Sequence, residues 1–289
     1  MKGKFVWIAI LFLCFAFVSI ASADVTVFTY RAPESSNDKR YEYDNAVLKL
    51  ALDKTKDTWG DYKLVPSPVM NFARGISAMR ERMMENPMFK LSASEQHCSD
   101  FAYAPFPIDL GIVGYRMFFV SEGVNSELNG VDSLDRLKKF SIGQGFGWLD
   151  NEILTEAGFK VVIVPKYESL FQMVVKARFD LFSRGINEVE EEYKAHQDLD
   201  GLCLNRKVGL YYPLPRFFFT HKRNKMAARR VYEGLVLAYN DGSLMRLWQD
   251  KYSTSLEFAD FENVKFLEID NPFIEGIDDS YKQYFRKIN

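Results

Sequence analysis

Residues 140–221 alternate strand-like and helix-like stretches, and this alternation limits the fold more than any other feature of the sequence. FSIGQG (140–145) predicts a strand that enters a glycine turn, and WLDNEILTEA (148–157) predicts a helix. KVVIVP predicts the next strand, apolar side chains at helical spacing from residue 167 predict another helix, and FDLFSR predicts a short buried strand. Such alternation is typical of βα units around a mostly parallel sheet.

Two similar stretches flank this α/β block. GYRMFFVSE (114–122) and LPRFFFTHK (214–222) both place an arginine before an apolar aromatic run. We expect the chain to leave a first lobe through the earlier stretch and to return through the later one, as a single long aromatic strand. The expected first lobe comprises residues 24–114 plus 221–289, and the expected second lobe comprises residues 115–220. The pattern predicts a two-lobed α/β protein, with a mostly parallel sheet flanked by helices in each lobe and two hinge strands between them.

The remaining sequence supplies elements for the first lobe. VTVFTY (25–30) predicts a strand, and apolar residues from Tyr43 to Ala51 predict a helix that ends near Lys54. YKLVPSPV (62–69) predicts a strand near a sheet edge, because proline cannot donate to a central ladder. We also expect a methionine-rich helix around 76–84, a strand at 88–94, and helices around 231–238 and 243–252, with no assignment from residue 253 onward.

The N-terminus has the layout of a secretory signal peptide. Lys2 and Lys4 precede an apolar stretch that runs from Phe5 to Ile20, and Ala21-Ser22-Ala23 provides the small residues of a cleavage site. The apolar stretch is shorter than the roughly 20 residues that a membrane-spanning helix needs. We expect residues 1–23 to be removed and the mature protein to begin at Asp24 in the periplasm or outside the cell.

Size and charge narrow the class of protein. Cleavage after residue 23 would leave 266 of the 289 residues, which is near the size at which a chain divides into two cores. Loss of Lys2 and Lys4 leaves 35 basic residues against 39 acidic ones. This balance gives no support for a nucleic acid or an anionic membrane surface as partner.

Cysteine and histidine give no metal pattern. The mature chain would keep Cys98 and Cys203, which we expect in different lobes. A disulfide between them would lock the lobes together, and the sequence leaves both the paired and the free state open. His97, His196 and His221 are scattered without metal-ligand spacing, so we expect neither a metal nor a cofactor.

Several longer phrases carry a resemblance to a known family. These are SLDRLKKFSIGQGFGW, GFKVVIVPKYESLFQMVVKARFD and KMAARRVYEGLVLAYNDGSLMRLWQDKY, together with a signal peptide that ends in ASA. In these phrases and in the order of its elements, the chain resembles the type II periplasmic substrate-binding proteins, most closely the family 3 solute-binding proteins of amino-acid ABC transporters. The resemblance covers nearly all of the mature chain. It implies a monomer that captures a small ligand between its lobes and delivers it to an ABC permease.

The sequence departs from this family at two positions that contact the ligand. Family members usually have Thr-x-x-Arg after the third strand, where the arginine binds the ligand carboxylate, but this chain reads SASEQHCSD. They also usually have an aspartate that binds the ligand ammonium, shortly after an acidic residue that corresponds to Asp180. In this chain Arg184 stands near that place. The resemblance therefore implies an acidic, peptide-like or unusual ligand more than an ordinary α-amino acid.

The candidate ligand-binding residues lie in two groups. Gln144, Gly145 and Trp148 form a turn whose N–H groups could bind an anion at a helix start, and Trp148 could also stack on a ligand. Arg184 ends a strand where a cleft is expected and could bind a carboxylate or phosphate through two hydrogen bonds. The alternatives are a plain turn for the first group and a salt bridge from Arg184 to Glu188 or Glu190. The remaining candidates are Tyr30, Arg31, Arg74 and Arg116, and Arg116 could instead form a pair across the hinge.

Two other functions stay open. A soluble sensor would present its ligand to a membrane kinase or cyclase, and the sequence does not separate that role from transport. Some proteins of this fold are cyclohexadienyl dehydratases, but the chain has no Ser-His-Asp arrangement, paired histidines or nucleophile elbow. We therefore expect a binding protein and not an enzyme.

Overall fold

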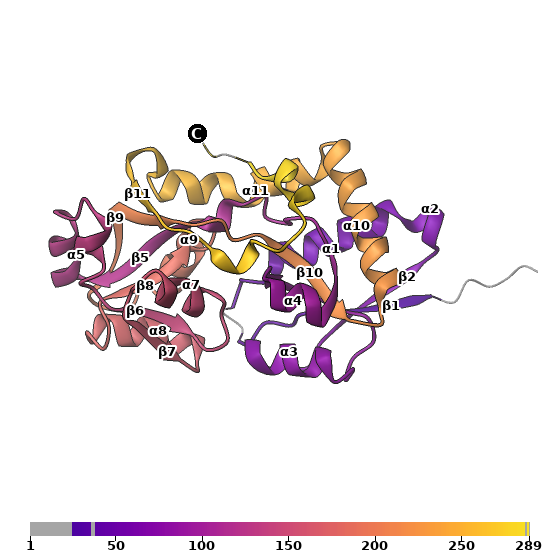
Figure 1. Cartoon of the computed structure of the whole chain (residues 1–289), viewed down its shortest axis with the longest axis horizontal. Coiled ribbons are helices and arrows are strands. Elements are labelled where there is room, and N and C mark those ends of the chain that lie inside the picture. The colour runs from indigo at the N-terminus through magenta and orange to yellow at the C-terminus, as the bar shows by residue number, and fades with distance from the viewer. Residues whose placement is uncertain (1–24, 36–37, 287, 289) are drawn as a thin grey trace, which may run out of the picture.

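The computed structural model describes residues 25–35, 38–286 and 288. Two sheets, each flanked by helices, form two lobes that lie side by side (Figure 1). This arrangement confirms the expected α/β class with two lobes. The predicted signal peptide, residues 1–23, lies outside the described residues. Within the described residues, every helix is too short or too polar to cross a membrane.

The first sheet has five strands in the order β2-β1-β3-β10-β4. Their bounds are β1 (Thr26–Tyr30), β2 (Tyr62–Pro66), β3 (Pro87–Ser92), β4 (Phe101–Ala104) and β10 (Arg216–His221). β1 is parallel to β2 and β3, whereas β10 is antiparallel to β3 and β4. The proline-containing strand β2 lies at the edge, as its sequence predicts.

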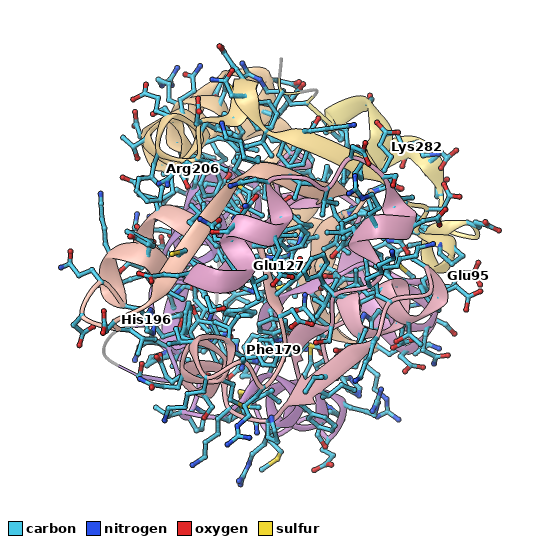
Figure 2. All side chains as sticks on the ribbon, turned by 90° about the vertical axis from the view of Figure 1, so that its left-hand side faces the viewer. Glu95, Glu127, Phe179, His196, Arg206 and Lys282 are labelled. Atoms are coloured by element: carbon cyan, nitrogen blue, oxygen red, sulfur yellow. The ribbon has the colours of Figure 1, made fainter. Side chains whose placement is uncertain are left out.

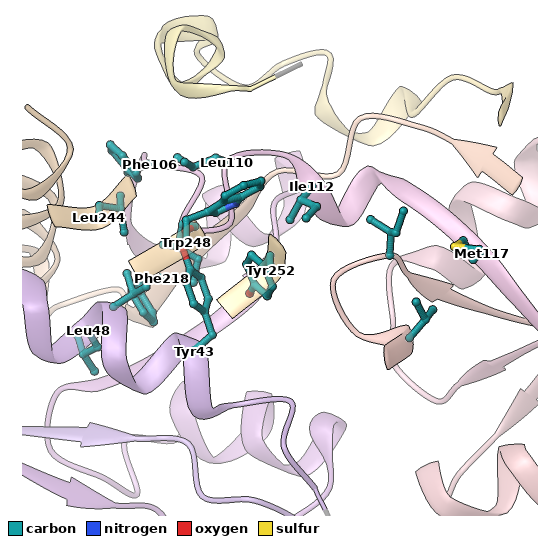
Figure 3. Packing of buried hydrophobic residues seen from close by; sticks show 14 of the residues in the cluster. Tyr43, Leu48, Phe106, Leu110, Ile112, Met117, Phe218, Leu244, Trp248 and Tyr252 are labelled. Carbon is teal, nitrogen blue, oxygen red and sulfur yellow. The ribbon is translucent and has the colours of Figure 1, made fainter. Parts of the chain in front are cut away.

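Helices cover both faces of this sheet. They are α1 (Glu42–Lys54), α2 (Lys56–Trp59), α3 (Phe72–Arg80), α4 (Glu95–Asp100) and α10 (Lys225–Asn240). The short helix η1 (Ile112–Gly114) and α11 (Ser243–Phe258) also contact elements of the second lobe, β8 and α9. α1 buries Tyr43, Val47, Leu48 and Ala51, which recur at helical spacing and share one face. Figure 3 shows Tyr43 beside Trp248 and Tyr252 of α11, in the largest apolar cluster of the protein.

The second sheet has six strands in the order β11-β9-β5-β8-β6-β7. Their bounds are β5 (Tyr115–Ser121), β6 (Ile142–Gly145), β7 (Val161–Val164), β8 (Leu181–Gly185), β9 (Leu202–Tyr211) and β11 (Lys265–Glu268). The helices are α5 (Glu122–Leu128), α6 (Leu134–Leu137), α7 (Asp150–Glu156), α8 (Tyr167–Val175) and α9 (Val189–Ala195). β6 is parallel to β7 and β8, which confirms the βα alternation predicted for this block.

The return to the first lobe differs from the expectation. The single long strand that we predicted is two strands, because β9 ends at Tyr211 and β10 begins at Arg216. Pro213 and Pro215 lie between them, and proline lacks the N–H group that a continuous ladder requires. β10 belongs to the first sheet, so the chain returns at residue 216, before the boundary at 221 that we expected.

The C-terminal segment touches both lobes. β11 adds to the edge of the second sheet by pairing in parallel with β9, although the sequence predicted no strand there. The short helices η2 (Phe261–Asn263), η3 (Pro272–Ile274) and η4 (Asp279–Tyr284) lie on either side of it in the chain. Tyr281 of η4 packs against Phe217 of β10, with ring centroids 5.4 Å apart. Residues 260–286 therefore connect the second sheet to the first, as the top of Figure 1 shows.

Charges of both signs cover the surface. Figure 2 views the protein from the second-lobe side, with Glu127 of α5 at the front and Glu95 and Lys282 towards one edge. Cys98 of α4 and Cys203 of β9 lie in different lobes, as expected, and both are free thiols. The lobes are thus joined by the chain itself and by noncovalent contacts.

Candidate ligand-binding cleft

A cavity lies between the two sheets, with about 60 Å³ of space for water-sized molecules. The first lobe lines it with loop residues before α1, the start of α3, the end of β3, α4 and the start of β10. The second lobe lines it with the start of α7 and the end of β8. The lining residues are Arg40, Tyr41, Phe72, Lys90, Ser92, His97, Trp148, Leu149, Asp150, Arg184, Glu188 and Arg216.

Strand pairing brings the polar residues of the first-lobe wall together. Lys90 and Ser92 are two residues apart on β3 and therefore point to the same face of the sheet. Arg216 on β10 pairs directly with Ser92 in the antiparallel register, which places its side chain on that face too. Lys90 Nζ lies 2.7 Å from Oδ1 of the buried Asp44. The wall therefore carries two cations and a hydroxyl at the carboxyl end of β3.

Aromatic rings form the apolar part of the cavity. Tyr41 and Phe72 contribute from the first lobe, and Trp148 contributes from the second. Gly145 fixes the position of Trp148, because a Cβ atom at residue 145 would lie 2.4 Å from Cε2 of the indole. The glycine that we predicted as an anion-binding residue is therefore required for close packing of the tryptophan.

Arg184 is bound by two glutamates through Nε and Nη2. Its Nε donates to both carboxylate oxygens of Glu192, at 3.0 and 2.9 Å, and Nη2 donates to Oε1 at 2.6 Å. Nη2 also lies 3.0 Å from Glu188 Oε2. The guanidinium is 4.9 Å from the centroid of the Trp148 ring. This is the salt-bridge alternative that the sequence left open, with Glu192 in place of Glu190.

The two glutamates differ in their electrostatics. Burial opposes the ionisation of Glu188, but Arg184 and Arg216 outweigh it and hold the pKa of this carboxyl well below its usual range. Burial raises the pKa of Glu192, although Arg184 and the Tyr167 hydroxyl, which donates to Oε1 at 2.6 Å, oppose that shift. Glu188 thus faces the cavity as an anion, while Glu192 anchors Arg184 from behind.

Arg216 is held by charge rather than by hydrogen bonds. Within the described residues its single ion pair joins Nη1 to Glu188 Oε1 at 3.5 Å, across the cavity. Burial lowers the pKa of Arg216, but the carboxylates of Glu188, Asp109 and Asp150 outweigh it, and the pKa lies above its usual value. The side chain is only 11% exposed. Most of its N–H donors are therefore left for a molecule in the cavity.

A loop from the first lobe closes one side of the cleft. Arg40 is fixed by Asp38, with Nε 2.7 Å from Oδ1 and Nη2 2.9 Å from Oδ2. Its guanidinium lies 3.8 Å from the centroid of the Tyr167 ring in the second lobe. Ser35 Oγ donates to Glu168 on the same helix at 3.4 Å. These contacts hold the lobes together in the conformation that the structure shows.

Two predicted site residues are buried behind the cavity wall. Arg116 of β5 is 0% exposed, with Nη2 2.9 Å from Oδ1 of Asp150 and Nη1 donating to the Val113 carbonyl at 3.2 Å. Gln144 is also 0% exposed and donates from Nε2 to the Ser183 carbonyl at 3.2 Å. Arg116 reaches the cavity indirectly, because it orients Asp150, which lines the cavity.

The other first-lobe candidates lie away from the cavity. Tyr30 ends β1, where its carbonyl accepts a hydrogen bond from Ser67 N at 2.9 Å. Arg31 is 3% exposed and packs behind Tyr41 and Phe72, with its guanidinium 5.0 and 5.5 Å from their ring centroids. Arg74 is exposed on α3. Of the eight predicted residues, Trp148 and Arg184 are therefore the two that line this interlobe cavity.

Part of the glycine turn is already hydrogen-bonded within the chain. Phe146 N donates to the Val164 carbonyl at 3.0 Å, and Trp148 N donates to the Gly145 carbonyl at 3.3 Å. α7, which follows the turn, has only seven residues. The plain-turn alternative fits these contacts.

Sequence reasoning missed most of the polar wall. Lys90, Ser92 and Arg216 meet through the pairing of β3 with β10, which are far apart in the chain. Asp150 and Glu188 supply carboxylates from the second lobe. The family resemblance instead directed attention to the position near Arg184, where family members usually have an aspartate. In the sequence, Arg216 stands before an aromatic run, as Arg116 does in β5. This repeated pattern was the one available sign that Arg216 matters. Among the described residues, no cluster of three histidine, cysteine, aspartate or glutamate side chains could hold a metal ion.

Comparison with known proteins identifies the fold. No protein-family model matches the sequence, and no curated protein matches it. An ancestral arginine-binding protein bound to arginine is similar in structure, with a TM-score of 0.58 and 16% identity over 80% of this chain and 99% of that one. The GluR0 ligand-binding core from Nostoc punctiforme, in complex with L-glutamate, gives a TM-score of 0.55 and 15% identity over 78% of this chain and 99% of that one.

A third similar structure comes from work on glutathione import through GshT and a cystine ABC importer of Streptococcus mutans. Its TM-score is 0.59, with 14% identity over 80% of this chain and 95% of that one. These likenesses, together with the two sheets and the cavity between them, show the two-lobed fold of periplasmic binding proteins. It is the fold of the substrate-binding proteins of amino-acid ABC transporters, as the sequence resemblance implied.

Proposed function

We propose that this protein is a periplasmic solute-binding protein that captures a small acidic ligand between its lobes and delivers it to an ABC transporter. The observation that carries the proposal is the interlobe cavity, to which each lobe contributes charged side chains and aromatic rings. A site divided in this way is completed only when the lobes come together. Ligand binding would therefore favour the closed state, as hinge closure around a ligand requires.

The structural neighbours support a binding role over an enzymatic one. These neighbours are an arginine-binding protein, a ligand-binding core in complex with L-glutamate and the substrate-binding protein of an amino-acid ABC transporter. The cavity wall carries cations for an anionic group and carboxylates, from Asp150 and Glu188, for a cationic one. The ligand would therefore be a small organic anion that can also carry an ammonium group. We propose that Trp148 and Arg184 form the second-lobe wall against which it rests.

Export is part of the proposal. The basic residues, the apolar stretch and the ASA sequence at the N-terminus favour cleavage before Asp24. The intact mass of the exported protein tests this directly. A mass that corresponds to residues 24–289 is expected, and a mass that retains residues 1–23 would contradict it.

Native mass spectrometry of protein purified from its own host tests the binding role. We expect a fraction of the protein to carry one small acidic molecule, which is lost on denaturation. Protein that never carries a ligand, and that no small molecule stabilises, would contradict the proposal. A sensing role is the second candidate, since one neighbour is a ligand-binding core. Genes for a permease and an ATPase beside this gene would favour transport, and a signalling gene would favour sensing.

A further inference from the structure

Most cations at the cavity are already neutralised by a close carboxylate. Arg40 is held by Asp38, Lys90 is paired with Asp44 at 2.7 Å, and Arg184 is bound by Glu192 through both oxygens. Arg216 differs from them, since its one contact, to Glu188, is 3.5 Å long. A guanidinium that is mostly buried and weakly hydrogen-bonded is a strong site for an oxyanion, because it can offer two parallel N–H groups.

The neighbours of Arg216 extend this site. Ser92 lies directly opposite it in the strand register, and Lys90 lies diagonally opposite on the same face. All three line the same cavity. A carboxylate that receives two N–H groups from Arg216 would therefore lie within reach of a hydroxyl and an ammonium from β3.

Three carboxylates also lie near Arg216, and their charge opposes the approach of an anion. Glu188 faces Arg216 from the segment after β8, Asp150 from the start of α7, and Asp109 from the segment before η1. They keep Arg216 protonated but leave most of its N–H donors unused. An incoming anion needs to displace only the 3.5 Å contact with Glu188, whose other oxygen keeps Arg184 and the Gly185 N–H group as partners.

We infer that Arg216, with Ser92 and Lys90, forms the anion-binding subsite of the cleft and recognises a carboxylate on an organic ligand. This inference rests on the proposed function, since it assigns the residues that recognise the ligand of the same cleft. It moves the main anion contact from Arg184 in the second lobe to the first-lobe strand β10. The aromatic rings of Tyr41, Phe72 and Trp148 would pack against the body of that ligand.

A panel of paired compounds tests the inference. The panel contains small carboxylates and their carboxamides, including L-glutamate with L-glutamine, succinate with succinamide and benzoate with benzamide, and also inorganic phosphate and sulfate. Thermal shift identifies binders of the wild-type exported protein, and calorimetric titration gives their affinities. We expect at least one carboxylate to bind at least about 10-fold more tightly than its amide.

Three variants then locate the subsite. Arg216→Gln should weaken that carboxylate by about 10- to 150-fold, and Arg216→Lys should recover part of the loss, because an ammonium cannot form two parallel bonds. Ser92→Ala changes no charge and should weaken binding by a few-fold, which keeps the test valid if Arg216→Gln folds poorly. Arg74→Ala, at an exposed position on α3 outside the cavity, should bind like wild type. Circular dichroism confirms the fold of each variant.

Each other outcome contradicts the inference. If no carboxylate binds, if the amide binds as tightly, or if Arg216→Gln and Ser92→Ala both retain full affinity, the subsite is wrong. Stabilisation by phosphate or sulfate alone would contradict an organic carboxylate as the ligand. A neutral ligand that still closes the lobes would support ligand capture between the lobes while overturning both the acidic ligand and this inference, so failure of the subsite and failure of the binding role are distinguishable.

Discussion

Arg216 Nη1 lies 3.5 Å from Glu188 Oε1, and this contact joins the two walls of the cavity. Arg216 begins β10 in the first lobe, whereas Glu188 follows β8 in the second. Because burial is nearly complete on both sides, the charges act through a medium of low polarity. The two walls are therefore already held together by their own charged side chains, and a ligand carboxylate would replace Glu188 as the partner of Arg216.

The pair of Arg184 and Glu192 should contribute strongly to stability. Both side chains are buried, and loss of the guanidinium would leave two glutamates without their main partner. Arg184→Ala is expected to lower the free energy of unfolding by about 3–5 kcal/mol, measured by chemical denaturation. Lys194→Ala is the control, because it breaks the solvent-exposed pair with Glu190 and should cost less than about 1 kcal/mol. Equal effects of the two substitutions would contradict this assignment.

Gly234 of α10 should not tolerate even a methyl group. A Cβ atom there would lie 2.0 Å from the backbone oxygen of Ala51 on α1, and neither helix backbone can move independently. Alanine in a helix usually stabilises by about 1 kcal/mol relative to glycine, but we expect Gly234→Ala to destabilise by about 1–3 kcal/mol. Thermal unfolding measures the effect.

Gly123 provides the matched control for this substitution. It lies on α5, and a Cβ atom there meets no other atom within 4 Å. Gly123→Ala should therefore leave the unfolding temperature unchanged or raise it slightly. If Gly234→Ala were equally harmless, the close packing of α1 on α10 would be wrong.

Asp109 should make the stability depend on pH. Its carboxyl is 0% exposed, and burial raises its pKa to about 6, against the influence of Arg216 and Lys90. In the unfolded chain the group titrates near its usual value of about 3.9. As pH rises from about 4 through 6, the unfolded state ionises first, and the folded state loses stability relative to it.

The size of this effect follows from the shift. About two pKa units correspond to roughly 3 kcal/mol of stability lost between pH 4 and pH 7 from this one group. Asp109→Asn should remove the loss, so the variant is expected to gain stability over wild type as pH rises through that window. Denaturation at pH 4.5 and pH 7.5 measures the difference. A difference between variant and wild type that is the same at both pH values would rule out the raised pKa.

The sequence predicts elements whose pattern is local. The apolar residues of α1, α8, β6 and β7 recur at a helical or strand period, and the structure has these elements where the sequence predicts them. The two-lobed class follows from their order. β9 was predicted only in its final part, since its first seven residues, LCLNRKV, mix polar and apolar side chains and depend on pairing with β5. β11 has four residues and exists through its pairing with β9. Such strands depend on distant partners.

The site was predictable only in part, for the same reason. Trp148 and Arg184 lie in the βα block, where local pattern places strand ends near a cleft, and both line the cavity. Lys90, Ser92 and Arg216 come together through an antiparallel register between strands more than 120 residues apart. Arg31 was chosen for its place at the end of the first strand and Arg116 for its place in the strand between the lobes, but both are buried beside other partners, which position in the sequence does not reveal.

Small-angle X-ray scattering of the mature protein tests the central claim, that this cleft closes on a ligand. Protein that is unfolded, freed of ligand and refolded is compared with the same protein after the co-purifying ligand is restored. We predict a smaller radius of gyration with ligand, because both lobes contribute residues to one site. Scattering curves that superimpose, while calorimetry shows the site to be saturated, would contradict the account.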